Sequence, residues 1–228
     1  MSEGAFLVLE GIDGSGTTTQ AALLAEALRA RGHEVVLTRE PTSRAIGSLL
    51  RAALQHRLTL PSGEPATLPP TSLALLFAAD RLDHLAHVVE PALDRGAIVI
   101  SDRFDLSSLV YQSATDPEGV KALEWLRSIN GRARRPDLTI VVDVPAGVAE
   151  ERRQRRGGEA ELFEQRALQE RLAESYRRAE TLVPGDRVVH VRGDQSEELV
   201  SAEVLEVVLA ELTARDRPRL APRPEKTS

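Results

Sequence analysis

The sequence predicts an α/β fold in which helices flank a parallel five-stranded sheet. Short apolar runs alternate with longer amphipathic stretches along almost the whole chain. The runs carry apolar residues at consecutive positions, as strands do when helices cover both faces of their sheet. A glycine-rich segment, 11–16, follows directly after the first run. Ligands of such sheets bind outside the carboxyl ends of the strands, so we expect the functional residues at that edge.

Each predicted element has its own local signal. The first strand, 6–9, is apolar throughout, and the helix after it, 17–31, places its leucines and alanines on one stripe. Gly32 ends that helix, as glycine often does. Pro91 predicts a bend within a long amphipathic helix, 72–94, and the polar, proline-rich segment before it, 58–70, is predicted to be a loop. The other predicted strands are 35–37, 97–101, 138–142 and 187–191, and the other predicted helices are 46–55, 161–182 and 197–214.

Length and composition fit one globular domain better than two small ones. The chain has 228 residues, of which 42% are hydrophobic and 28% are charged. These values are ordinary for a domain with a sizeable core. We expect a single domain over 1–213. The segment 214–228 is rich in proline and charge, and we expect it to be a disordered tail.

Charge and cysteine content limit the possible partners. The chain has no cysteine, which excludes disulfides and cysteine-ligated metal sites and favours a reducing cytoplasm. It shows no signal-like start and no apolar stretch long enough for a bilayer, so we expect a cytoplasmic protein without a membrane partner. A net charge of −6 disfavours nucleic acid as a partner. Arginines gather within 132–135 and 152–156, and such clusters can bind small polyanions.

The glycine-rich segment predicts a phosphate-binding loop. Gly11 and Gly16 have the spacing of the first and second glycines in the pattern G-x-x-x-x-G-K-[ST]. Glycines let the backbone curl so that its N–H groups point inward, and the following helix adds its positive N-terminal dipole. Thr18 then stands where a hydroxyl ligand of Mg²⁺ belongs. Two glycines at this spacing also arise by chance in a plain strand–turn–helix, so the flanking strand and helix are what favour the phosphate loop.

The loop departs from the pattern at one position, because Thr17 occupies the place of the lysine. That lysine normally neutralises the β- and γ-phosphates of the nucleotide. An arginine from elsewhere can supply the same charge, and the cluster Arg152, Arg153, Arg155 and Arg156 is the obvious source.

Three further groups of residues are candidates for the same site. Asp102 and Arg103 follow the third predicted strand, where a carboxylate can reach Mg²⁺ and a guanidinium can bind a phosphate bidentately. Arg39 follows the second predicted strand. Phe77 and Arg81 lie four apart on a predicted helix and share a face, which suits stacking on a pyrimidine and hydrogen bonding to its edge. The structural alternatives are a solvated pair at a turn, an ordinary loop charge, and a core phenylalanine beside a surface arginine.

Two histidines have a spacing that also occurs in metal sites. His84 and His87 lie three apart on the same predicted helix. No third ligand or carboxylate pattern accompanies them, so a solvated helix face is the preferred interpretation.

Taken in order, these segments resemble the thymidylate kinase family of P-loop nucleoside monophosphate kinases, and the resemblance runs from Phe6 to about Leu212. The departures are Thr17 and Val110, which replaces the usual alanine of one motif. The matching segments are Gly11-Ile12-Asp13-Gly14-Ser15-Gly16 with Thr18-Thr19-Gln20, Arg39-Glu40-Pro41, Leu76-Phe77 with Asp80-Arg81, Asp102-Arg103-Phe104 with Ser107 and Tyr111-Gln112, and Phe163-Glu164 with Tyr176.

The resemblance implies a kinase that transfers phosphate from ATP to dTMP, with Mg²⁺, a mobile lid at about 148–160 and a homodimeric assembly. It implies that Asp13 positions the acceptor phosphate and helps to hold Mg²⁺ with Thr18 and Asp102. It also implies that Arg153, Arg156 or a neighbour swings in from the lid. The residues implied for ATP are Gly11, Ile12, Asp13, Gly14, Ser15, Gly16, Thr17, Thr18 and Arg192.

For the acceptor, the resemblance implies that Arg39 and Arg103 hold the phosphate and that Phe77 stacks on thymine. Ser107 and Tyr111 would line the deoxyribose. The residues implied for the thymine edge and the rest of the substrate shell are Arg81, Gln112 and Glu164.

Two alternatives stay open at this point. The first is a P-loop kinase for another nucleoside monophosphate, which the combination of Phe77, Arg81 and Tyr111 disfavours because it suits thymine on a deoxyribose. The second is a catalytically weak nucleotide-binding module, because the lysine is missing. The retained Asp13, Arg39 and Arg103 argue against it, since a module without turnover has no need to hold an acceptor.

Overall fold

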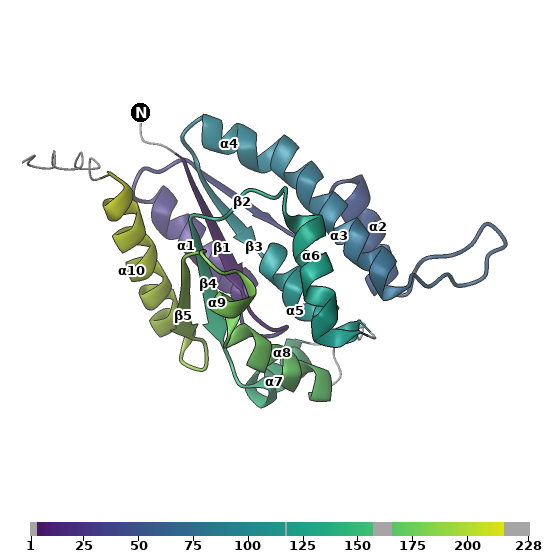
Figure 1. Cartoon of the computed structure of the whole chain (residues 1–228). Coiled ribbons are helices and arrows are strands. Elements are labelled where there is room, and N and C mark those ends of the chain that lie inside the picture. Colours follow the sequence, from purple (N-terminus) through teal and green to yellow (C-terminus); the bar gives the residue numbers. More distant parts are fainter. Residues whose placement is uncertain (1–3, 117, 157–165, 217–228) are drawn as a thin grey trace, which may run out of the picture.

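The computed structural model describes residues 4–116, 118–156 and 166–216. A single parallel sheet forms its centre, with strand order β2-β3-β1-β4-β5 and helices on both faces (Figure 1). The predicted fold class is confirmed. The strands are β1 Ala5–Glu10, β2 Val35–Arg39, β3 Ile98–Asp102, β4 Leu138–Asp143 and β5 Val188–Arg192.

Strand register brings three chain segments to one edge of the sheet. Leu9 on β1 pairs with Asp102 on β3, and Asp102 in turn pairs with Arg39 on β2. The carboxyl ends of the central strands therefore meet directly below the glycine-rich loop that leaves β1. This is the edge at which the sequence predicts the site.

The helices largely follow the predicted pattern. The long helix predicted over 72–94 is α3 Pro70–His84, a π-helical segment Leu85–Val89 and α4 Glu90–Asp94. The irregular segment lies just before Pro91, which has no N–H to give to a regular helix. The segment predicted as one helix over 161–182 contains two separate helices, and 161–165 lie outside the described residues. The remaining predicted helices are α1 Thr17–Arg29, α2 Ala45–Leu54, α8 Arg166–Tyr176, α9 Ala179–Leu182 and α10 Glu197–Asp216.

Three α-helices were not predicted, and one boundary needs correction. The structure adds α5 Asp105–Thr115, α6 Ala122–Asn130 and α7 Ala146–Arg156, with a short 3₁₀ turn Gly119–Lys121 before α6. Helix α10 continues through Asp216, so the first residues of the predicted tail 214–228 are helical. The rest of that tail lies outside the described residues.

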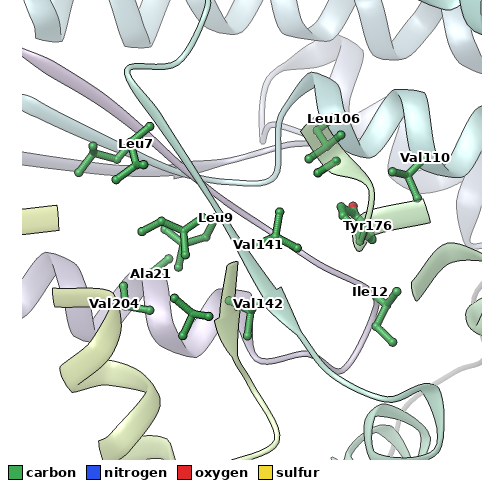
Figure 2. Packing of buried hydrophobic residues seen from close by; sticks show 14 of the residues in the cluster. Leu7, Leu9, Ile12, Ala21, Leu106, Val110, Val141, Val142, Tyr176 and Val204 are labelled. Carbon is green, nitrogen blue, oxygen red and sulfur yellow. The ribbon is translucent and has the colours of Figure 1, made fainter. Parts of the chain in front are cut away.

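Side chains of β1 alternate between two apolar clusters. Leu7 and Leu9 pack with Ala21 of α1, while Phe6 and Val8 pack with Val89 on the other face. Figure 2 shows the first cluster around Leu9 and Val141. Burial of both faces explains why the strands read as continuous apolar runs. Because β1 is buried on both faces, the start of the phosphate loop is anchored to the core.

Candidate active site

The glycine-rich loop joins β1 to α1 in the conformation that the sequence predicts. Gly14 and Gly16 have φ values of 89° and 99°, in the left-handed region that favours glycine. Gly16 is the N-cap of α1 and has no side chain to cover the amides of the first turn. Those amides and the helix dipole suit an anion above the loop.

Two arginines of α7 lie on this loop. Arg153 donates from Nη1 to the carbonyl oxygen of Asp13. Arg152 donates from Nη1 to the carbonyl oxygen of Ser15 at 3.3 Å and from Nη2 to that of Gly193 at 2.8 Å. The structure thus brings cationic groups to the loop whose lysine is replaced by the buried Thr17.

The other two arginines of the cluster differ from these. Arg155 is exposed and lies 3.9 Å from Glu151 on its own helix. The side chain of Arg156 lies outside the described residues, so its predicted role stays a prediction.

The turn after β5 approaches the phosphate loop through Gly193. A Cβ atom at this position would lie 2.5 Å from Val142 and Val144, so only glycine fits between the strands. Arg192, which the resemblance implies for ATP, precedes it with an exposed side chain paired to Asp194 at 3.2 Å. Arg152 links this turn to the phosphate loop.

Of the three residues predicted for the metal shell, Thr18 and Asp102 are in direct contact. Thr18 donates from Oγ1 to Oδ2 of Asp102 at 2.5 Å. The other carboxylate oxygen of Asp102, Oδ1, is buried and has no hydrogen-bond partner among the described residues. A hydroxyl and a carboxylate oxygen at the foot of a phosphate loop fit a Mg²⁺ ion that keeps several waters. Asp13 instead accepts a hydrogen bond from Arg103 Nη2 at 2.6 Å.

A cavity of about 120 Å³ opens beside the phosphate loop. Six of the eight residues predicted to bind the acceptor line it. Phe77 is only half-buried there, which excludes the interpretation of this ring as a core residue. The lining comprises Asp13, Glu40, Pro41, Leu54, Phe77, Arg81, Arg103, Phe104, Ser107, Ser108, Tyr111 and Gln112.

The two exceptions are Arg39 and Glu164. The side chain of Arg39 is exposed at the end of β2, and Arg39 does not belong to the lining of this cavity. Glu164 lies outside the described residues. Both roles stay predictions.

Arg103 is held at the floor of the cavity by contacts on several sides. Its guanidinium donates to Asp13, to Ser107 Oγ at 3.1 Å and to the Tyr176 hydroxyl at 3.4 Å. It also lies 5.1 Å from the ring centre of Tyr111, a cation–π distance. The backbone of Arg103 has φ 75°, a strained conformation for a residue with a side chain. The backbone strain and the contacts together fix a cation where an acceptor phosphate would sit.

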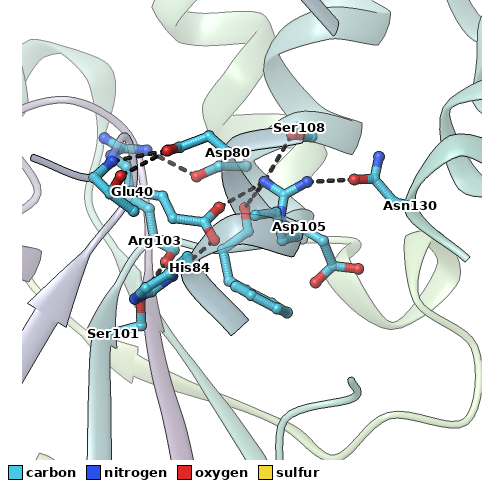
Figure 3. A network of polar contacts seen from close by, with 12 residues as sticks. Glu40, Asp80, His84, Ser101, Arg103, Asp105, Ser108 and Asn130 are labelled. Atoms are coloured by element: carbon cyan, nitrogen blue, oxygen red, sulfur yellow. Dashed lines mark hydrogen bonds and ion pairs between the residues drawn. The ribbon is translucent and has the colours of Figure 1, made fainter. Parts of the chain in front are cut away.

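Arg81 lines the cavity and is buried in a polar network, whose members Glu40, Ser108 and Asn130 are labelled in Figure 3. Its Nη1 donates to Asn130 Oδ1, while Nη2 donates to Glu40 at 2.8 Å, Ser108 at 3.0 Å and the carbonyl oxygen of Phe104 at 3.1 Å. Its Nε, by contrast, is buried without a hydrogen-bond partner among the described residues. The guanidinium is therefore locked in place and keeps one donor for a ligand.

The prediction of a solvated helix face is wrong for His84 and confirmed for His87. His84 is buried, with Nε2 2.8 Å from Thr38 Oγ1 and Nδ1 3.1 Å from Glu40. His87 is exposed beside Asp83. Within the described ranges, no group of three histidine, cysteine or acidic side chains could hold a metal ion.

Leu54 and Ser108 of the lining were not predicted, and neither was a third residue, Glu10, which lies next to the cavity. Glu10, at the end of β1, is fully buried and accepts hydrogen bonds from the backbone and side chain of Ser107 and from the Tyr176 hydroxyl. Burial raises the pKa of its carboxyl from 4.5 to about 7, while Arg103 and the hydrogen bonds oppose the shift. The only sequence signal is a glutamate that closes an apolar strand directly before the glycine loop.

Comparisons with known proteins agree with this geometry. The family model described as "Thymidylate kinase" matches residues 9–204. A "Probable thymidylate kinase" of Thermococcus onnurineus is 39% identical over 215 residues, which cover 92% of this chain and 100% of that protein. A "Thymidylate kinase" of Ruegeria pomeroyi is 40% identical over 215 residues (92% and 96%), and one of Thiobacillus denitrificans is 46% identical over 168 residues (72% and 76%). The chain belongs to the thymidylate kinase family.

Proposed function

We propose that this protein transfers the γ-phosphate of ATP to dTMP and releases dTDP and ADP. The observation that carries the proposal is a pair of unsatisfied polar groups in one cavity: Arg81 Nε and Gln112 Oε1 are both buried, and neither has a hydrogen-bond partner among the described residues. A buried polar group left without a partner is costly, so such a pair indicates a ligand that satisfies both.

The pair matches the edge of a thymine or uracil ring. Arg81 Nε can only donate, which suits the O4 acceptor of thymine. Gln112 Oε1 can accept from the neighbouring ring N3–H. Cytosine would present an amino donor to the guanidinium at that position, and a site built on hydrogen bonds rejects such a mismatch strongly. Phe77 lines the same cavity with an aromatic ring that suits stacking on the base.

Arg103 supports phosphate transfer at the other end of the cavity. Its two Nη groups can bind a phosphate bidentately, and Asp13 keeps them oriented. An oxygen of the acceptor phosphate attacks the γ-phosphorus, and the bond from that phosphorus to the bridging oxygen of ADP breaks. The acceptor is already an anion, so the reaction needs positioning and charge neutralisation rather than a strong base.

The phosphate loop, Arg152 and Arg153 would bind the transferring phosphates. Amides of 14–18 would surround the anion. The two arginines lie within hydrogen-bond distance of the loop carbonyls. Thr18 and Asp102 would hold Mg²⁺, which neutralises charge on the phosphates when bound. Asp13 would contribute to this shell through its orientation of the acceptor.

Lid, assembly and location complete the proposal. The lid would cover about 148–160 within a single kinase domain, 1–213; helix α7 carries its first part onto the phosphate loop. Homodimerisation would use the paired helices α2 and α3, whose surface exposes Leu49, Leu75 and Leu82. Among the described helices none is long and apolar enough to cross a membrane. A cytoplasmic location fits the cysteine-free sequence.

The test is ADP formation by the purified protein with ATP, Mg²⁺ and each of dTMP, dUMP, UMP, CMP, AMP and GMP. We expect turnover to be strongest with dTMP. Preference for CMP or a purine acceptor would contradict the roles of Arg81 and Gln112 but keep the kinase. ATP binding without any turnover would identify a nucleotide-binding module. Sedimentation of wild type and Leu75→Glu tests the dimer, and the variant is expected to be monomeric.

A further inference from the structure

Glu10 places a carboxyl group at a position where the fold alone does not require one. It ends the central strand of the sheet, is fully buried, and accepts hydrogen bonds from four donors. Oε1 accepts from the backbone N–H groups of Phe104 at 2.8 Å and Ser107 at 3.1 Å. Helix α5 begins here, and its N-cap residue makes no side-chain cap of its own. Glu10 thus caps this helix from another strand.

The same carboxylate also controls two hydroxyls that contact Arg103. Oε2 accepts from Ser107 Oγ at 2.6 Å and from the Tyr176 hydroxyl at 3.0 Å. A hydroxyl has one hydrogen, so a hydroxyl that gives it to a carboxylate can offer only lone pairs to its other neighbours. Both hydroxyls accept from Arg103 Nη1, Ser107 at 3.1 Å and Tyr176 at 3.4 Å, because a guanidinium can only donate. The two hydroxyls also lie 2.9 Å apart, so the carboxylate of Glu10 is what draws both of their hydrogens away from Arg103.

We propose that Glu10 is a positioning residue for phosphate transfer: by orienting the hydroxyls of Ser107 and Tyr176 as acceptors, it holds the Arg103 guanidinium against Asp13 at the floor of the acceptor cavity. This inference rests on the proposed function, because Arg103 is the group that would bind the acceptor phosphate. Glu10 does not line the cavity and touches no substrate in this role.

Burial of a carboxylate makes a purely structural role a poor explanation. A neutral acceptor such as serine or asparagine can cap a helix without the cost of a buried charge. The raised pKa of Glu10 reflects that cost. What a neutral side chain with one acceptor oxygen cannot do is accept from all four donors and also attract the guanidinium beyond the hydroxyls. Tyr176 also ends α8, the helix that follows the proposed lid, so the network ties that helix to the acceptor side.

The decisive variant is Glu10→Gln. If the glutamine oxygen keeps the two amide contacts, its NH₂ faces the two hydroxyls and donates to them. One hydroxyl can then give its hydrogen to the other at 2.9 Å, but the second has lost its carboxylate acceptor, and its hydrogen turns toward Arg103 Nη1 and weakens that contact. We expect kcat/KM for dTMP to fall at least about tenfold, with KM for ATP changed less than about twofold.

A double-mutant cycle with Arg103→Ala separates positioning from general damage. If Glu10 acts through Arg103, Glu10→Gln should lower kcat/KM less than about twofold in the Arg103→Ala background. Asp137→Asn is the matched control: Asp137 also accepts from a backbone N–H of β1, that of Phe6 at 2.7 Å, but at the opposite end of the strand. We expect its kinetics to match those of wild type.

Two outcomes would overturn the inference: an unchanged kcat/KM in Glu10→Gln, or an equal loss with and without Arg103. Crystal structures of wild type and Glu10→Gln give an independent reading. The proposal fails if Arg103 keeps its contacts with Ser107 and Asp13 in the variant. If wild type does not phosphorylate dTMP, the proposed function fails, and the position of Arg103 in the two crystal structures still decides the role of Glu10.

Discussion

Gly14 packs against the aliphatic part of the Arg153 side chain. A Cβ atom at Gly14 would come within 3.1 Å of Arg153 Cγ and within 2.4 Å of the carbonyl oxygen of Ala149. The phosphate loop and α7 are therefore packed backbone to backbone, and only glycine permits the approach. This contact brings Arg152 and Arg153 to the loop that lacks the usual lysine.

Replacement of Gly14 by alanine should separate α7 from the loop. The added methyl group meets backbone atoms that cannot give way, and φ at this position is 89°. We expect kcat to fall at least about a hundredfold, because the loss combines strain in the loop with displaced arginines. Steady-state kinetics measures this. Gly147→Ala, on a helix position with open space around it, is the control and should retain wild-type kcat.

Arg153→Ala should lower turnover far more than dTMP affinity. Arg153 touches the phosphate loop and is absent from the lining of the acceptor cavity. A well-placed arginine is worth about 10³–10⁵ in phosphoryl transfer, so we expect a loss of at least about a hundredfold in kcat. Arg155→Ala, at an exposed position of the same helix, should change kcat little. Equal activity of Arg153→Ala and Arg155→Ala would contradict the assignment.

Thr17→Lys tests the compensation directly. A lysine at this position would supply the charge that α7 now brings. In the Thr17→Lys background, the kcat penalty of Arg153→Ala should shrink at least about tenfold. The four proteins of this cycle are compared at saturating ATP and dTMP. Strict additivity of the two substitutions would show that Arg153 does not stand in for the lysine.

Gln112→Leu should weaken recognition of the base and spare the transfer step. The variant keeps the volume of the side chain but removes the acceptor that faces the cavity. We expect KM for dTMP to rise about tenfold to a hundredfold, in line with a lost buried hydrogen bond of about 1–3 kcal/mol, with a smaller change in kcat. Isothermal titration with dTMP checks the affinity. An unchanged dissociation constant would remove Gln112 from the base site.

Glu10 should give folding stability a distinct pH dependence. Its carboxyl has a pKa of about 7 in the folded protein against 4.5 as the reference value. The folded state therefore holds the proton more tightly, so stability falls as pH rises from about 4.5 through about 7, by up to about 3 kcal/mol. In Glu10→Gln this slope should disappear, as urea unfolding at a series of pH values would show. His190, whose pKa is raised by its hydrogen bond to Asp143, also loses stabilisation as pH rises, but only above about 6.5, and it contributes equally to both proteins.

The sequence predicts the elements whose burial leaves a pattern. All five strands and most of the helices predicted around the sheet are found within a few residues, because each presents apolar side chains to the core. Helices α5 and α6 were missed although they also bury apolar residues, among them Leu109 and Leu126. Helix α7 leaves no such pattern. It is rich in charge, and its contribution to the core is limited to the first turn, with Ala146, Val148 and Ala149. Ala149 and Arg153 also meet the glycine loop. So short an apolar stripe gives periodicity little to detect.

The residues of the candidate site also fall into those that the sequence could predict and those that it could not. Residues within a recognisable motif, such as Phe77, Arg103 and Gln112, are brought to one cavity as expected. Glu10 could not be predicted, because a single glutamate at the end of a strand reads as a solvated charge. Its partners Phe104 and Tyr176 lie 94 and 166 residues away in the sequence, and only the fold places them around it.

The missing lysine has a consequence for how the site is assembled. In the usual phosphate loop, the cradle and its positive charge belong to one short stretch of chain. Here the cradle is made by 11–18, while the charge arrives with Arg153, which is 140 residues from Asp13 in the sequence. A chain still being synthesised would therefore contain the residues of the cradle long before β4 pairs with β1 and α7 adds its arginine. If Arg153 supplies the missing charge, nucleotide affinity is a property of the nearly complete molecule, and a product that ends before α7 would bind ATP weakly.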